Sequence, residues 1–197
     1  MTHFDYDLHP VSRIIADAVG EPGNRTFYLQ ARQGTHLVSL IMEKQQVSAL
    51  ATSVLQLLEE LEEQNPSLAR ARSQANLRSL EMPLDPAFRV SQLGLGYDEE
   101  EDLVVIVAQS FSSAPELDDP DLDDDEDEIE QGAIAQEDND ALLARFYATR
   151  NQMRTFSEHA LQVVQAGRPD CPLCGRPIDP HGHFCPRTDG HAFPLMV

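Results

Sequence analysis

Three cysteines and one histidine near the C-terminus have the types and spacing of metal ligands. Cys171 and Cys174 stand three positions apart in Cys-Pro-Leu-Cys-Gly, and His183 and Cys185 follow in His-Phe-Cys-Pro. Two thiolates at this spacing bind one tetrahedral metal ion, and the glycine permits a close turn that brings backbone N–H groups to the sulfurs. If residues 183–185 are extended, His183 and Cys185 point to the same side and converge on the ion. The sequence therefore predicts a zinc knuckle.

The fourth ligand is open to alternatives. His183 is favoured, His191 would instead close a longer second knuckle that begins at Cys185, and His181 is the third candidate. Three cysteines and one histidine fill a tetrahedron and leave no position for water, so a structural Zn²⁺ is expected rather than a catalytic one. The chain has only these three cysteines, all in this segment, which is typical of metal binding and not of a disulfide framework.

Other residues of possible chemistry have no recognisable catalytic spacing. Lys44, the only lysine, is expected to be a solvated residue in the first turn of a helix. The turn-forming stretch 20–25, GEPGNR, lacks the spacing of a phosphate-binding loop. A cluster of four arginines is expected at the solvated surface: Arg70, Arg72, Arg78 and Arg89. It is a candidate site for a phosphate-bearing partner, and the alternative is that it holds the acidic insertion of the same chain. These observations leave enzymatic activity open and favour a protein without it.

The net charge of −20 is a local property of the chain. Nineteen of its thirty-four acidic residues lie between positions 90 and 144, where there is no lysine or arginine. The densest part, 115–140, has few large apolar residues and is predicted to be a disordered insertion. The overall charge disfavours nucleic-acid and membrane partners. No apolar stretch is long enough to span a bilayer and the N-terminal residues do not resemble a signal peptide, so a cytoplasmic protein is expected.

The segments that must position these residues alternate between strand and helix patterns. Apolar residues at three- and four-residue steps predict one helix from about 43 to 63 and a second from 149 to 166, where Thr149 and Gln152 form a capping box. Aliphatic and aromatic runs predict strands at 13–19, 25–31, 36–42, 88–97, 103–111 and 142–148.

The predicted fold class is α+β, with an antiparallel sheet, two amphipathic helices packed on one face of it, and a C-terminal zinc knuckle. The expected organisation is a body that begins in 1–114, an acidic insertion at 115–140, a second strand-helix unit at 141–168 and the zinc segment at 169–197. The two strand-helix units align with Gln46 over Gln152 and Leu50 over Phe156. An internal duplication is one explanation, and chance likeness of two amphipathic helices is the other.

Three stretches together resemble a known family: GEPGNRTFYLQ, EKQQV and the ending CPLCGRPIDPHGHFCPRTDGH. They resemble the uncharacterised bacterial domain-of-unknown-function family numbered three thousand and ninety, known mostly from actinobacteria and chloroflexi. The resemblance covers nearly the whole chain and implies a bacterial cytoplasmic protein with a cysteine-rich C-terminus. It also implies that the position of His191 is not always histidine, which favours His183 as ligand. It implies no activity.

Three functions are compatible with the sequence. The first is a zinc-stabilised protein-binding or adaptor module with an unidentified cytoplasmic protein partner. The second is an enzyme or enzyme subunit that acts on a small phosphorylated or thiol metabolite through the GEPGNR stretch, Lys44 and the arginines. The third is nucleic-acid binding through the zinc knuckle and the arginine patch. The lack of a recognisable acid, base and nucleophile set favours the first.

Overall fold

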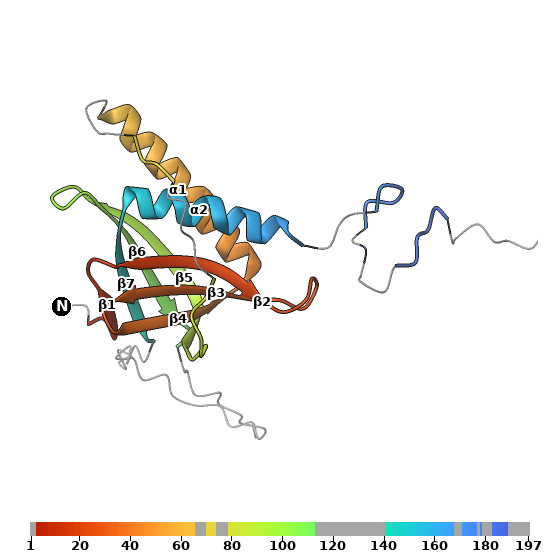
Figure 1. Ribbon diagram of the computed structural model, residues 1–197, viewed down its shortest axis with the longest axis horizontal. Helices are drawn as coiled ribbons and strands as arrows, with labels where there is room; N and C mark the ends of the chain where they lie inside the picture. Colours follow the sequence, from red (N-terminus) through yellow and green to blue (C-terminus); the bar gives the residue numbers. More distant parts are fainter. Residues whose placement is uncertain are drawn as a thin grey trace, which may run out of the picture.

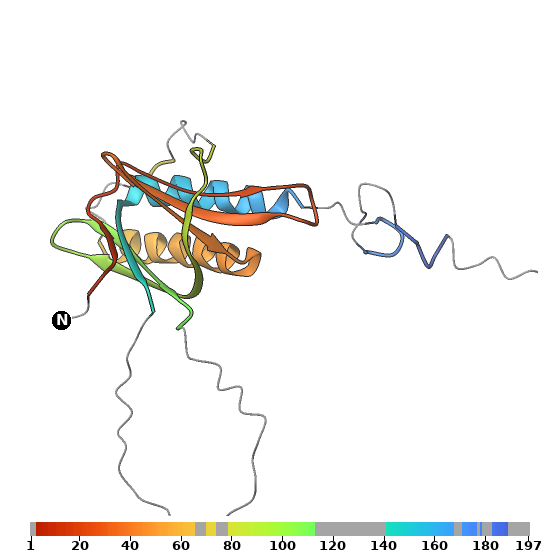
Figure 2. The same ribbon diagram turned by 90° about the horizontal axis from the view of Figure 1, so that it is seen from below.

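A computed structural model describes residues 3–65, 70–73, 79–112, 141–167, 171–176, 178 and 183–188. The predicted acidic insertion at 115–140, His181, His191 and Arg78 lie outside the described residues. Two helices and seven strands are described (Figures 1 and 2). In chain order they are β1 (Tyr6–Leu8), β2 (Arg13–Val19), β3 (Thr26–Gln33), β4 (His36–Met42), α1 (Lys44–Gln64), β5 (Pro86–Asp98), β6 (Leu103–Ser110), β7 (Leu143–Thr149) and α2 (Arg150–Gln165).

The strands form one sheet in the order β1-β7-β6-β5-β4-β3-β2. Neighbouring strands run antiparallel except at two places, β4 beside β5 and β1 beside β7, where they run parallel. The mixed α+β class is therefore confirmed, and the expected antiparallel sheet is mostly so. The helix α1 lies between β4 and β5 in the chain, which is the kind of crossover that a parallel pair requires.

The chain uses the same local arrangement twice. Three antiparallel strands, β2 to β4 and then β5 to β7, each lead directly into a helix. Both helices begin with a capping box whose third helical residue is a glutamine, Gln46 in α1 and Gln152 in α2. The Gln46 amide donates to the Val90 carbonyl at 3.1 Å, and the Gln152 amide donates to the Val11 carbonyl at 3.1 Å. An internal duplication would produce this repeated arrangement, and the duplication itself stays a prediction.

Each helix buries one stripe of side chains. The buried residues of α1 are Val47, Leu50, Ala51, Val54 and Leu58, and those of α2 are Met153, Thr155, Phe156, Ser157 and Ala160. Fully burying a large apolar side chain contributes about 1.5–3 kcal/mol, so these stripes fix the helices on the core. The helices lie next to each other in both views, with α1 in contact with β5 and α2 in contact with β2. That both cover one face of the sheet remains a prediction.

The two helices run in opposite directions. Near the end of α1, Glu62 pairs with Arg154 in the first half of α2 at 3.4 Å. At the other end, the Nζ atom of Lys44 lies beside Gly167, just after α2.

Neither helix combines the length and the apolar character that crossing a membrane requires, within the part of the chain that is described.

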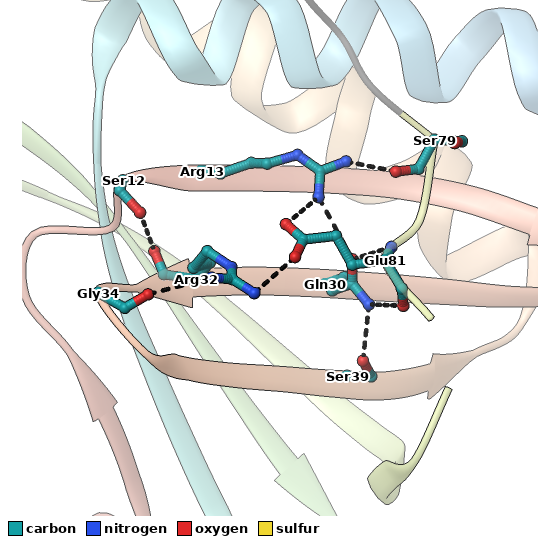
Figure 3. A network of polar contacts seen from close by, with 8 residues as sticks. All are labelled: Ser12, Arg13, Gln30, Arg32, Gly34, Ser39, Ser79 and Glu81. Carbon is teal, nitrogen blue, oxygen red and sulfur yellow. Dashed lines mark hydrogen bonds and ion pairs between the residues drawn. The ribbon is translucent and has the colours of Figure 1, made fainter. Parts of the chain in front are cut away.

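A polar clamp holds the segment before β5 against the sheet (Figure 3). Gln30 of β3, only 1% exposed, accepts a hydrogen bond from the Glu81 N–H at 2.8 Å and donates one to the Glu81 carbonyl at 3.1 Å. The Glu81 carboxylate pairs with Arg13 of β2 at 2.8 Å and with Arg32 of β3 at 2.6 Å. A buried side-chain amide must be hydrogen-bonded, and this one is satisfied by backbone groups of a distant segment.

Candidate metal centre

The four predicted ligands converge in the structure. The sulfur atoms of Cys171 and Cys174, the sulfur of Cys185 and a ring nitrogen of His183 all lie within 4.8 Å of one another. The Cys171 and Cys185 sulfurs are 3.9 Å apart, and the Cys174 sulfur is 3.3 Å from His183 Nε2. A tetrahedral zinc ion with Zn–S bonds of ~2.3 Å places its sulfurs about 3.8 Å apart. The four side chains therefore lie close enough to hold one metal ion.

Two tight turns position the cysteines. In the first, the Gly175 N–H donates to the Cys171 carbonyl at 2.8 Å, and the Cys171 N–H donates to the Arg176 carbonyl at 2.8 Å. Gly175 has φ +71°, a left-handed conformation that glycine adopts without a side-chain clash. In the second turn, the Thr188 N–H donates to the Cys185 carbonyl at 3.1 Å. Together the two turns bring the three cysteine sulfurs within 4.8 Å of one another.

The second turn stabilises a thiolate. The Thr188 hydroxyl and, with it, the backbone N–H groups of Arg187 and Thr188 lower the pKa of Cys185 to about 6, against the effect of burial. At Cys174 the Arg176 N–H also lowers the pKa, but burial and the neighbouring thiols of Cys171 and Cys185 outweigh it, and the pKa is raised. The hydrogen bonds of the second turn thus favour the thiolate form of Cys185, which is the form that binds a metal ion.

This geometry supports His183 as the fourth ligand and does not test the two other candidate histidines. His183 lies within the cluster, whereas His181 and His191 lie outside the described residues. The donor set of three thiols and one imidazole fits a soft or borderline ion such as Zn²⁺ better than a hard ion that prefers oxygen. The residues present therefore fit the predicted group, and the identity of the metal stays a prediction.

The other predicted residues do not gather into one site. Lys44 lies beside Gly167 at the end of α2, and Arg25 of the GEPGNR turn donates to the Val163 carbonyl in the last turn of α2 at 3.3 Å. Both cations face the carbonyl end of a helix, where positive charge is stabilised. Arg70 and Arg72 lie near the opposite end of α2, where the Arg72 N–H donates to the Asn151 side chain, so the metabolite site expected from the GEPGNR stretch, Lys44 and the arginines is not assembled in one place.

The four arginines are also separated from one another. Arg89 pairs with Glu43 at the start of α1 at 2.6 Å, and Arg70 pairs with Glu62 near its end at 3.3 Å. The rise of a helix places those two glutamates about 28 Å apart along α1. Arg70 and Arg72 remain neighbours, and Arg78 lies outside the described residues. The expected patch is thus reduced to a pair with a distant third member.

Sequence reasoning missed two exposed apolar side chains at the metal centre. Leu173 lies between Cys171 and Cys174 and is 48% exposed, and Phe184 lies between His183 and Cys185 and is 64% exposed. Their position between ligands was visible in the sequence. A residue between two ligands of one ion has its backbone fixed and its side chain directed away from the ion, which was the available signal.

The family model described as Protein of unknown function (DUF3090) matches residues 6–185. The chain therefore belongs to this family, as the resemblance predicted. The match includes the strands, both helices and all four candidate ligands. No curated protein and no solved structure matches the chain.

Proposed function

We propose that this member of the family is a cytoplasmic protein-binding module whose C-terminal segment is held in shape by a structural Zn²⁺. The observation that carries the proposal is the pair of exposed apolar side chains, Leu173 and Phe184, placed between the ligands of a closed four-ligand site. The metal site would supply rigidity, and the apolar pair would supply contact with an unidentified protein partner. The proposal includes no membrane or nucleic-acid partner.

The ligand set supports a structural role for the ion. Three thiolates and one imidazole complete a tetrahedron, so the ion has no coordination position for water or substrate. The N–H groups around Cys185 add a second layer of hydrogen bonds that fixes the ligand orientation. Such a site holds together a segment that is too short to build its own apolar core.

The apolar pair supports a binding role. The described residues include five exposed large hydrophobic side chains, and two of these belong to this short segment: Leu173 and Phe184. An apolar side chain on a rigid backbone loses little conformational freedom when a partner covers it, so it contributes efficiently to binding. An exposed leucine and phenylalanine on a metal-fixed turn therefore fit a protein partner better than a nucleic acid, whose phosphates the net charge of −20 repels.

Metal analysis tests the first half of the proposal. Protein purified without chelator should carry about one zinc ion per chain, and Cys171→Ser, Cys174→Ser and Cys185→Ser should each lose it. Separate replacement of His183 and His191 by alanine identifies the fourth ligand, because only the true ligand weakens metal binding strongly. Protein free of any transition metal would end the zinc proposal.

Quantitative pull-down from native lysate tests the second half with matched variants. Leu173→Ser with Phe184→Ser should reduce recovery of the specific partner about tenfold or more, because a central apolar contact is lost. The control is Val19→Ser with Phe111→Ser, which replaces side chains with the same exposures, 48% and 64%, on the body. Equal loss in both variants, or no protein enriched by the wild type over Cys171→Ser, would contradict the binding role.

A further inference from the structure

A second candidate site lies in the body, away from the metal ligands. A cavity of about 610 Å³ is lined by residues of three segments, among them Arg70, Arg72, Glu101, Asp102, Arg150 and Asn151. Residues 70–72 follow α1, Glu101 and Asp102 belong to the turn between β5 and β6, and Arg150 and Asn151 begin α2. The volume is within the range of pockets that hold small metabolites.

The segment that carries two of the arginines is fixed in place. Ala71 is 5% exposed and belongs to the hydrophobic core, and its N–H donates to a Glu62 carboxylate oxygen at 2.9 Å. The next N–H, of Arg72, donates to the Asn151 side-chain oxygen at 2.7 Å. Because Ala71 points into the core, Arg70 and Arg72 flank it at the surface of the cavity. Their guanidinium groups start from a defined backbone.

The acids of the cavity are already partnered. Asp102 accepts hydrogen bonds from Arg150 Nε at 2.6 Å and Nη2 at 3.0 Å, and from the Tyr97 hydroxyl at 2.6 Å. Glu101 pairs with His9 at 2.6 Å. The Asp102 carboxylate is thus engaged by Arg150 and pairs with neither Arg70 nor Arg72.

Around the cavity there are more arginine side chains than carboxylates that pair with them. Glu62 is shared by Arg70, at 3.3 Å, and Arg154, at 3.4 Å. Within the described part of the chain, the Arg72 guanidinium has no ion pair, and the side chain is exposed. Arg70 is 79% exposed and is only partly engaged by Glu62. Two arginine side chains that line the same cavity, Arg70 and Arg72, are thus available to an anion in a protein whose net charge is strongly negative.

From this geometry we propose that the cavity binds a small phosphomonoester. Guanidinium forks bind pairs of phosphate oxygens with two parallel hydrogen bonds each, and a dianion uses both Arg70 and Arg72. Asn151 and the hydrogen-bonded Arg150–Asp102 pair line the cavity and form the wall against which the rest of the ligand lies. The negative charge of the whole chain opposes long polyanions and tolerates a small one. This site is independent of the metal centre.

Titration calorimetry and ³¹P NMR with full-length zinc-loaded protein test the proposal, with glycerol phosphate and inorganic phosphate as probes and sulfate as a comparison ion. We expect saturable binding of glycerol phosphate in the millimolar range or tighter, and weaker binding of sulfate. The double variant Arg70→Gln with Arg72→Gln should weaken this binding about tenfold or more. Arg89→Gln, at the far end of α1, is the control and should leave it unchanged.

Arg72→Gln alone guards against a structural explanation, because in the described residues it breaks no ion pair. Its melting curve should match the wild type while its phosphate affinity falls. Absence of saturable phosphomonoester binding would overturn the proposal, and so would equal affinity in the wild type and the double variant. Binding that falls equally in Arg89→Gln would show a general charge effect and would also overturn it. None of these results depends on the protein-binding role, since Leu173 and Phe184 are unchanged.

Discussion

The body, residues 3–167, and the Cys/His segment, residues 171–188, differ in what is buried. The hydrophobic core of the body includes side chains from all seven strands and both helices. In the described residues of the Cys/His segment only Cys171 and Cys185 are buried, and both are candidate metal ligands. The body is therefore stabilised by removing apolar surface from water, whereas the segment, under the proposed metal binding, would be stabilised by ligand bonds to an ion.

Because of this difference, unfolding of the body and loss of structure in the Cys/His segment should be separate events. No described residue of the Cys/His segment belongs to the core of the body, so each region should lose its structure without the other. The four tyrosines, Tyr6, Tyr28, Tyr97 and Tyr147, all lie in strands of the body, and the chain has no tryptophan. Tyrosine fluorescence therefore reports unfolding of the body alone, and metal content reports the segment.

The largest expected effect is the response to metal removal. Binding of a structural zinc ion contributes about 10–16 kcal/mol to the folding of a small segment, so a chelator or Cys171→Ser should abolish its order. The free energy of unfolding of the body should stay within about 0.5 kcal/mol, because the described residues of the segment contribute nothing to its core. Hydrogen exchange of residues 171–188 and tyrosine-monitored melts measure the two effects. A body destabilised by several kcal/mol would show that the two regions are one unit.

The opposite experiment damages the body and spares the metal. Leu50 is 4% exposed and Phe156 is fully buried, and each stands four residues after the glutamine of its capping box. Leu50→Ala should cost about 2–5 kcal/mol and Phe156→Ala about 3–5 kcal/mol, while zinc content stays unchanged. Denaturant melts measure the cost.

Exposed positions on the same helices are the controls. Ser53→Ala on α1 and Gln162→Ala on α2 should change the free energy of unfolding by no more than about 0.5 kcal/mol. Similar large costs at Leu50 and Phe156 are what equivalent positions in a duplicated unit require. A small cost at either one would show that the two helices are not equivalent.

The elements of the body were predictable because their patterns are local. Helix stripes and capping boxes depend on residues three or four positions apart, and the predicted helices at 43–63 and 149–166 nearly coincide with Lys44–Gln64 and Arg150–Gln165. The two parallel pairings were not predicted. Strand β1 has only three residues, and pairing β4 with β5 depends on how α1 crosses the sheet, which no short-range pattern records.

The proximity of the four candidate metal ligands was predictable for the same reason, and the arginine cavity was not. Cys171 and Cys174 are three positions apart, so their spacing alone restricts them to one ion. The cavity brings Arg72, Asp102 and Arg150 together from three distant segments. Asp102 stands in an acidic run and Arg150 at the start of a helix. Neither residue has sequence neighbours that indicate which side chain it pairs with.

The polar clamp provides a smaller test inside the body. Gln30→Ala removes the amide that bonds to both backbone groups of Glu81 and to the Ser39 hydroxyl at 3.1 Å. Leaving these groups without a partner should cost about 1–3 kcal/mol in denaturant melts, without loss of zinc. Gln92→Ala, an exposed glutamine of β5, is the matched control and should cost no more than about 0.5 kcal/mol. Equal costs would show that the clamp does not stabilise the sheet.

The smallest expected effect concerns how charge contributes to the body as pH changes. Hydrogen bonds from Arg150 hold the pKa of Asp102 below its usual value, with a smaller contribution from the Tyr97 hydroxyl and against the effect of burial. A carboxyl whose pKa is lower in the folded state stabilises the protein above its unfolded pKa and loses this contribution as the pH falls through the folded value. The Asp102 side chain is 48% exposed, so solvent limits the contribution to less than about 1 kcal/mol.

Asp102→Asn isolates this charge while keeping the backbone. Asp102 has φ +54°, and asparagine tolerates that conformation better than most residues. At neutral pH the variant should be less stable than the wild type by a few tenths of a kcal/mol, and near about pH 3 the difference should shrink as the wild-type carboxyl begins to take up a proton. Tyrosine-monitored melts must supply these values, because the tyrosines report the body alone and metal binding to the other region also depends on pH. A stability difference that is the same at both pH values would show that the Asp102 side chain acts through packing or backbone conformation. Its charge would then contribute nothing to the stability of the body, in contrast to the ligand bonds proposed for the Cys/His segment.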